Sequence, residues 1–298
     1  MLKETLRPYS HETASARAAY YAGNMYKIKT SQARVISITS GKGGVGKTNV
    51  VANLAYALAQ LGKKILVVDA DLGLANIDIL LGLTPKYNLQ HVIMGQKRLA
   101  EVIVTGPGGI KILPASSGVE ELTSLTMEQR KRLLAEFSLL DEAYDFVLID
   151  TAAGISGNVI YFNLAASEII NVVEPDPTSF TDAYALMKVL SVKYGANNFK
   201  ALINNVASEA EAKDIFEKLR LVTDKFLQIK LEYLGHILRD DKLREAVRLQ
   251  HAVTEIYPYA KSSRCFYQIV KNLCNVPKGE IKENSINRFI NRLLGKGD

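Results

Sequence analysis

Short runs of apolar, mostly β-branched residues alternate along this chain with longer segments in which apolar residues recur at helical spacing. A parallel sheet with crossover helices requires this alternation, because each helix returns the chain to the start of the next strand. The runs occupy residues 35–39, 65–69, 110–113, 146–150, 169–173, 201–205 and 234–238. The pattern therefore predicts a doubly wound α/β fold, with a mostly parallel sheet of about seven to eight strands flanked by helices.

Polar residues stand at the ends of several of these runs. Asp69 and Asp150 each close a run, and Asn204 lies near the end of another. In open α/β sheets, ligands bind at the edge where the parallel strands have their carboxyl ends. We therefore expect these three side chains at the ligand-binding edge of the sheet.

A glycine-rich loop follows the first run directly. It reads Gly41-Lys42-Gly43-Gly44-Val45-Gly46-Lys47-Thr48 and leads through Asn49 into a helical segment. Glycines let such a loop turn tightly, so that backbone N–H groups and a helix N-terminus point at phosphate oxygens. The spacing assigns Lys47 to the terminal phosphates and Thr48 to Mg²⁺, and it predicts that the nine residues 41–49 bind a nucleotide. Lys42 is a second lysine among the glycines and has no obvious structural partner in the sequence, which favours another phosphate contact.

Carboxylates after two of the runs indicate a metal site. Asp69 and Asp71 lie just beyond one predicted strand, and Asp150 follows four apolar residues in the arrangement called Walker B. Phosphoryl transfer depends on positioning and on charge neutralisation, which Mg²⁺ and an oriented water provide. We therefore predict Thr48, Asp69, Asp71 and Asp150 as metal-site residues, the alternative for Asp69 and Asp71 being that they cap the following helix.

Composition limits the remaining choices. A chain of 298 residues with 48% hydrophobic and 23% charged residues can bury one large core, and its net charge of +6 permits several kinds of anionic partner without selecting one. No apolar run has the roughly 20 residues of a transmembrane helix, and residues 1–17 lack the apolar core of a signal peptide. A cytoplasmic protein is expected.

Cys265 and Cys274 have no further Cys or His pair with which to bind a metal, so buried reduced thiols are expected.

The end of the chain has an amphipathic pattern. Residues 277–280 suggest a linker, and no acidic residue occurs between Asn284 and Gly297. The apolar positions are Ile286, Phe289, Ile290, Leu293 and Leu294, with Arg288 and Arg292 between them. Such a helix can lie in the interface of an anionic bilayer, but a terminal helix packed on its own domain shows the same pattern. The expected organisation is an N-terminal extension (1–33), a P-loop nucleotide-binding domain (34–276), and a linker with a C-terminal amphipathic helix (277–298).

The loop 42–48 resembles the deviant Walker A motif of the MinD/ParA class of ATPases. This resemblance implies that the chain binds ATP or ADP with Mg²⁺, hydrolyses ATP slowly and forms a homodimer when ATP is bound. It also implies that Lys42 contacts the nucleotide of the opposite subunit, and that Asp71 orients the attacking water. The residues predicted to act in catalysis are therefore Asp71, Lys42 and Lys47.

The same resemblance assigns a site for the base. It implies that Asn204 contacts adenine, although the neighbouring Asn205 could be confused with it, and that Arg239 and Asp240 belong to a loop around the purine. Leu238 stands where relatives have proline, so an ordinary surface loop is an alternative for that segment. Ala152 likewise replaces the proline of the loop that follows the Walker B residue.

Three further segments are similar to one branch of the class. Residues 71–82, 113–122 and 174–188 resemble FlhG, also called FleN or YlxH, a regulator of flagellar number and placement; the division protein MinD shares the first of them almost as well. This branch implies a protein that cycles between the cytoplasm and the inner face of the cell membrane. Its implied partners are the anionic membrane and flagellar proteins such as the GTPase FlhF or components of the switch complex.

Other roles remain open at this point. A MinD-type regulator of the division site would bind an inhibitor such as MinC instead of flagellar proteins. A ParA-type partitioning ATPase would bind DNA through basic surfaces, but the apolar face of the tail argues against specific nucleic-acid binding. FlhG relatives often carry an N-terminal D-Q-A-x-x-L-R motif that stimulates FlhF, and here only Leu6 and Arg7 match it.

Overall fold

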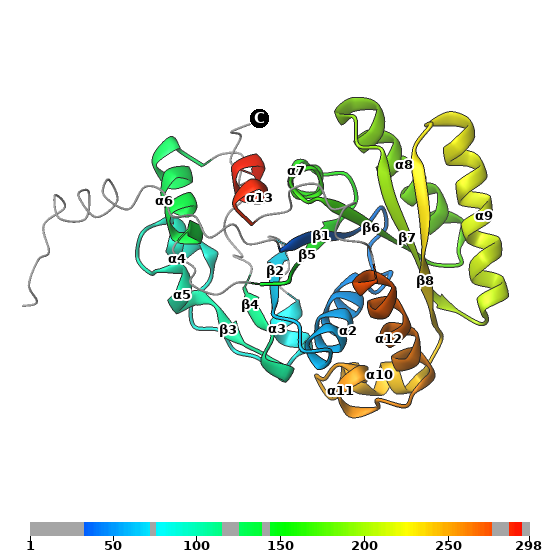
Figure 1. Cartoon of the computed structure of the whole chain (residues 1–298), viewed down its shortest axis with the longest axis horizontal. Coiled ribbons are helices and arrows are strands. Elements are labelled where there is room, and N and C mark those ends of the chain that lie inside the picture. Colours follow the sequence, from blue (N-terminus) through cyan, green and yellow to red (C-terminus); the bar gives the residue numbers. More distant parts are fainter. Residues whose placement is uncertain (1–32, 72–75, 115–124, 139–143, 276–285, 294–298) are drawn as a thin grey trace, which may run out of the picture. The chain divides into compact units, whose positions relative to one another are not determined.

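The computed structural model of the protein describes residues 33–71, 76–114, 125–138, 144–275 and 286–293, which belong to one compact unit, residues 31–298. Their strands form one eight-stranded sheet in the order β3-β4-β2-β5-β1-β6-β7-β8 (Figure 1). Every neighbouring pair is parallel except β3 with β4. The strands are β1 (Arg34–Ser40), β2 (Ile65–Ala70), β3 (Val104–Thr105), β4 (Lys111–Leu113), β5 (Phe146–Ala153), β6 (Glu168–Val173), β7 (Asn198–Val206) and β8 (Lys230–Leu238). The predicted fold class is confirmed.

Each of the seven apolar runs falls on one strand, whereas the antiparallel edge strand β3 was not predicted. β3 has only two residues, which is too short for a periodic signal. The helices are α2 (Lys47–Gln60), α3 (Ile77–Leu80), α4 (Leu89–Ile93), α5 (Leu99–Val102), α6 (Met127–Ser138), α7 (Gly157–Ala165), α8 (Pro177–Tyr194), α9 (Glu209–Phe226), α10 (Asp241–Arg248), α11 (Val253–Ile256), α12 (Lys261–Cys274) and α13 (Ile286–Leu293), with a 3₁₀ turn η1 (Pro107–Gly109).

Helices cover both faces of the sheet, which is why apolar residues are buried on both faces of its strands. Alternate residues of a strand point to opposite faces. In β1, Ile36 and Ile38 pack in the cluster that contains α2 and α12, whereas Val35 packs with α6, α7 and α13 on the other face. α8 and α9 continue that second layer over β6 and β7 (Figure 1). Because helices bury both faces of the sheet, a ligand reaches its polar side chains at the ends of the strands.

The C-terminal helix α13 packs on its own domain. The described part of this helix is Ile286–Leu293, within the segment predicted to be helical, and it contacts α6 and α7. Ile286, Phe289 and Ile290 are buried in one cluster with Phe137 and Phe162. Packing on the domain, the alternative to a membrane contact, therefore describes this helix here, and its contact with membrane stays a prediction. The side chains of Arg288 and Leu293, and all of Leu294, lie outside the described part of the chain.

No helix among the described residues has the length and apolar character needed to cross a bilayer. The linker predicted at 277–280 and the extension 1–32 lie outside the described residues. Cys265 and Cys274 are free and only half-buried, and not fully buried as expected.

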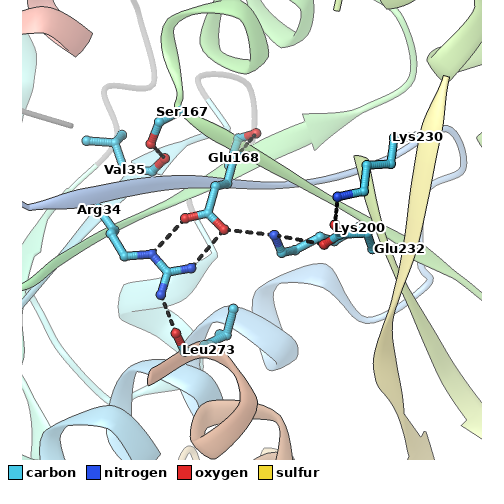
Figure 2. Close-up of polar contacts among 9 residues, drawn as sticks. Arg34, Val35, Ser167, Glu168, Lys200, Lys230, Glu232 and Leu273 are labelled. Carbon is cyan, nitrogen blue, oxygen red and sulfur yellow. Dashed lines mark hydrogen bonds and ion pairs between the residues drawn. The ribbon is translucent and has the colours of Figure 1, made fainter. Parts of the chain in front are cut away.

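A chain of charged groups joins four strands at the edge of the sheet opposite the glycine loop (Figure 2). Arg34 of β1 is 6% exposed and binds the carboxylate of Glu168 on β6 through Nε and Nη2, at 2.7 and 2.8 Å. Its Nη1 donates to the Leu273 carbonyl near the end of α12. Lys200 of β7 then bridges Glu168 and Glu232 of β8, at 3.1 and 3.4 Å. This network fixes the amino-terminal strand ends and the end of α12 relative to one another.

Removing Arg34 should destabilise the protein substantially. Arg34→Met leaves the carboxylate of Glu168 buried without its bidentate partner, and we expect a loss of about 3 kcal/mol in the free energy of unfolding at neutral pH. The control is Lys218→Met, which breaks an ion pair between side chains that are 65% and 60% exposed and should cost at most about 1 kcal/mol. Urea unfolding of both variants measures the difference.

The loss should also depend on pH in a definite direction. Burial by itself would raise the pKa of Glu168, but the hydrogen bonds and charges of Arg34 and Lys200 outweigh it and hold that pKa below its usual value. A depressed pKa gives stability that is present above the unfolded-state pKa and disappears as the pH falls through the folded-state pKa. The gap between wild type and Arg34→Met should therefore narrow on acidification, and a gap that stays constant would contradict this account.

Candidate functional site

The glycine loop forms a tight cradle between β1 and α2. Gly46, the residue before α2, has φ +82°, in the left-handed region that side chains disfavour. Gly41 approaches α8 so closely that an added Cβ would lie 2.1 Å from the carbonyl oxygen of Asp182. Lys47 is the first residue of α2 and is 9% exposed. The loop therefore presents backbone N–H groups, a helix N-terminus and an ammonium group to one point, as anion binding requires.

Two buried carboxylates lie beside this cradle. Asp69 on β2 and Asp150 on β5 are register partners in the parallel sheet and are 3% and 1% exposed. Burial, and to a lesser degree the charge of Asp150, raises the pKa of Asp69 to about 8, although Asp69 accepts backbone N–H bonds from Asp71 and Asn76 at 3.1 and 3.2 Å. Burial also raises the pKa of Asp150 to about 6, against the opposing effects of the Thr48 hydroxyl and Lys47. Without a positive charge nearby, ionisation of both carboxylates is therefore unfavourable.

The residues present fit a divalent cation. The buried oxygen Oδ1 of Asp150 has no hydrogen-bond partner in the structure, and the Thr48 hydroxyl interacts with the same carboxylate. A cation supplies the positive charge that two adjacent carboxylates need in order to ionise. No group of three or more His, Cys, Asp or Glu in the described part of the chain could hold a metal by itself. This agrees with Mg²⁺, which takes one or two carboxylates and completes its shell with water and phosphate oxygens.

The structure brings the predicted metal-site residues together. The Thr48 hydroxyl bonds to Asp150, and the charges of Asp69 and Asp150 interact. Asp71 contributes to the electrostatics of Asp150 and donates its backbone N–H to Asp69. Asp71 is the last described residue before the gap at 72–75. The role of its carboxylate with water stays a prediction.

Lys42 has a partner that the sequence did not reveal. Its Nζ lies 3.0 Å from Oδ1 of Asp176, which caps the N-terminus of α8. The Thr178 hydroxyl at 2.6 Å, the Ser179 N–H at 2.9 Å and Lys42 together hold the pKa of Asp176 far below its usual value. The Lys42 and Asp176 side chains are 38% and 34% exposed, so water screens the pair. Lys42 therefore rests against its own α8 at the rim of the site.

A cavity continues from the loop along the ends of β6, β7 and β8. Asn204, Arg239 and Asp240 line it, as predicted for the base site, together with Glu174 and Asn205. The Nδ2 of Asn204 donates to the Val45 carbonyl at 2.8 Å, so this side chain also braces the glycine loop.

The carboxylate of Asp240 is already used within the protein. Its Oδ1 accepts the Lys242 N–H at 3.0 Å and caps α10, and its Oδ2 accepts the Ser262 N–H and hydroxyl at 2.9 and 2.8 Å. Asp240 thus positions the cavity wall, and a contact between Asp240 and nucleotide stays a prediction. Glu174 and Asp176 were not predicted as site residues, although both follow β6 at the edge where the other site residues were sought.

The comparisons with known proteins agree with this geometry. A family model described as an AAA domain matches residues 33–203. The antiactivator FleN of Pseudomonas aeruginosa is 43% identical over 272 residues, covering 91% of this chain and 95% of FleN. The flagellum site-determining protein YlxH of Helicobacter pylori is 34% identical over 266 residues, covering 88% of this chain and 90% of YlxH.

Among solved structures, the septum site-determining protein MinD of Pyrococcus horikoshii, in complex with Mg-ADP, superposes with a TM-score of 0.64. Its identity is 27%, and the superposition covers 82% of this chain and 96% of MinD. A glycine cradle, paired acidic strand ends and similarity over nearly the whole chain lead to one assignment: this chain belongs to the family of FleN and YlxH, within the MinD-like P-loop ATPases.

Proposed function

We propose that this protein is an ATP-driven switch that dimerises, cycles on and off the membrane and regulates flagellar number and placement. The observation that carries the proposal is an intact phosphate cradle with its acidic partners in a chain that is similar over 91% of its length to FleN. Slow hydrolysis serves as a timer for partner binding. Its partners are flagellar proteins, such as the GTPase FlhF or components of the switch complex.

Each residue of the site has a task in ATP hydrolysis. The loop N–H groups and Lys47 hold the phosphates, and the Thr48 hydroxyl, Asp150 and Asp69 are the groups that would hold Mg²⁺. The cation, when bound, neutralises charge on the phosphates. Asp71 orients the attacking water in line with the terminal phosphate.

Lys42 couples hydrolysis to dimerisation in this proposal. In the single subunit it rests on Asp176 at 3.0 Å, in a pair that is more than one-third exposed on the lysine side. Such pairs contribute at most about 1 kcal/mol, so Lys42 leaves Asp176 readily when a stronger anion is presented. The nucleotide of a second subunit is that anion.

In this proposal, packing of α13 on its own domain competes with membrane binding and so controls it. The apolar face formed by Ile286, Phe289 and Ile290 cannot pack on α6 and α7 and enter a bilayer at the same time. Each large apolar side chain gains roughly 1.5–3 kcal/mol on leaving water, and this gain is similar in either place. α7 follows β5 and the loop beside Asp150 directly, so nucleotide-dependent movement there reaches the α13 docking site. A dimer presents two helices at once, which multiplies their effective affinity for the membrane.

The similarity to P. horikoshii MinD supports a second candidate, a regulator of the division site that recruits a MinC-like inhibitor. Deleting the gene separates the two roles. Electron microscopy of the deletion strain should show altered flagellar number or placement with normal septa. Minicells in a strain with normal flagella would favour the division role.

Substitutions in the site should separate nucleotide binding from hydrolysis. Lys47→Ala removes the ammonium group beside the phosphates and should abolish ATP binding. Asp71→Ala should bind ATP and dimerise yet hydrolyse it on the order of 100-fold more slowly, because the water loses its orienting group. Phosphate release and titration calorimetry measure the two effects, with Asp214→Ala on exposed α9 as control. Normal turnover by Asp71→Ala would remove this residue from the mechanism.

Lys42 should be needed for dimerisation but not for nucleotide binding. Lys42→Ala should bind ATP with nearly unchanged affinity and remain monomeric in sedimentation velocity with a non-hydrolysable ATP analogue. Asp176→Asn keeps both the cap of α8 and Lys42, so it should still dimerise. A dimer of Lys42→Ala with the analogue would show that Lys42 does not act across the interface.

Membrane binding should require both ATP and the terminal helix. The full chain should sediment with anionic liposomes in the presence of a non-hydrolysable ATP analogue and much less with ADP, whereas a version ending at Lys282 should sediment with neither. The lipid-binding helix is packed on α6 and α7 until the dimer forms, which is the reason for the nucleotide dependence. Equal sedimentation with ADP and with the analogue would contradict the coupling.

A further inference from the structure

Glu174 is held in a defined position on the wall of the cavity beside the glycine loop. It follows β6 directly and lines the cavity with Asn204 and Asn205. Its backbone N–H donates to the Ser179 hydroxyl at 2.9 Å, and its Oε1 accepts from Nδ2 of Asn205 at 3.2 Å. These bonds restrain Glu174 at both its backbone N–H and its carboxylate.

Asn205 orients Glu174 through an unusual backbone conformation. Its φ of +60° lies in the left-handed region, which asparagine tolerates better than most residues. Its amide donates to Glu174, and its Oδ1 accepts from Nε of Arg239 at 3.4 Å. The two bonds fix which end of the amide faces Glu174, and they link the ends of β6, β7 and β8 around the cavity.

The cavity offers hydrogen-bond acceptors to a ligand, besides the donor groups of Arg239 and Arg244 that also line it. One N–H of the Asn204 amide is bound to the Val45 carbonyl at 2.8 Å, and its Oδ1 can accept from a ligand. A carboxylate can only accept hydrogen bonds, so Glu174 adds further acceptor oxygens to the same wall. The amino group of adenine is a donor at the 6-position of the purine, whereas guanine carries an acceptor oxygen there.

We propose that Glu174 selects adenine over guanine nucleotides, with Asn205 as its positioning residue. This inference rests on the proposed nucleotide-binding function and names the residue that decides the base. A 6-amino group pairs with the acceptors on this wall. A 6-oxo group would face a carboxylate with no proton between them, so much of the selectivity arises from rejecting the wrong base.

The test compares two nucleotides in one variant. Glu174→Gln keeps the size of the side chain and its bond to Asn205, but its rotatable amide can donate to a 6-oxo group. Dissociation constants for non-hydrolysable ATP and GTP analogues with Mg²⁺ are measured by titration calorimetry. Wild type should prefer the ATP analogue, and Glu174→Gln should lower that preference by about tenfold or more, mainly through tighter binding of the GTP analogue.

Two further variants separate selectivity from folding. Asn205→Gly tolerates the positive φ and removes the amide that holds Glu174, so it should lower the preference to a smaller extent. Glu217→Gln, which alters an exposed glutamate on α9, should leave the preference unchanged. Urea unfolding of each variant checks that the fold is retained.

The outcomes are distinct. An unchanged ATP-to-GTP preference in Glu174→Gln, or an equal loss of affinity for both analogues, would overturn the assignment while the proposed ATPase function stands. A wild-type protein that binds neither analogue would overturn the proposed function itself, and this inference with it.

Discussion

The placement of two carboxylates side by side inside the sheet is the constraint on which the rest of the site depends. Asp69 and Asp150 are register partners on β2 and β5 and are almost fully buried. Water cannot screen them there, so their joint ionisation requires positive charge nearby. Lys47, the N-terminus of α2 and a cation beside Thr48 are the groups that supply it. The glycine loop, the sheet order and the metal site are therefore parts of one electrostatic arrangement.

The short stretch after β6 lies beside both the cavity and the glycine loop. Glu174 lines the cavity proposed for the base, and two residues later Asp176 caps α8 and holds Lys42. Ser179 accepts from the backbone of Glu174 and donates its own N–H to Asp176. A single turn of chain thus restrains both the group proposed to read the base and the group proposed to reach a second subunit. A nucleotide that moves this turn would act on both.

The two edges of the sheet have different tasks. At the amino-terminal edge, the network of Arg34, Glu168 and Lys200 is closed, because each charge has a partner within the protein (Figure 2). At the carboxyl edge, Asp150 retains a buried oxygen without a partner, and Lys42 rests in an exposed pair. The paired charges stabilise the sheet, whereas the Asp150 oxygen and Lys42 remain available to a ligand. The amino-terminal edge therefore holds the strands in register, and the carboxyl edge keeps groups that can bind a ligand.

Local spacing was sufficient to predict seven of the eight described strands, the glycine cradle, Thr48 and the acidic residues, because each depends on a few consecutive residues and on the known direction of parallel strands. The terminal helix was predicted for the same reason. Only the tertiary structure decided which element packs on each apolar face and which partner each charged side chain has. Periodicity identified the apolar face of α13 but not that α6 and α7 cover it. The pairing of Lys42 with Asp176 joins residues 134 positions apart, and Asp240, which caps α10, also accepts from Ser262 of α12, 22 positions along the chain. Partners of this kind are set by how helices pack across the sheet, and no local pattern in the sequence encodes that packing.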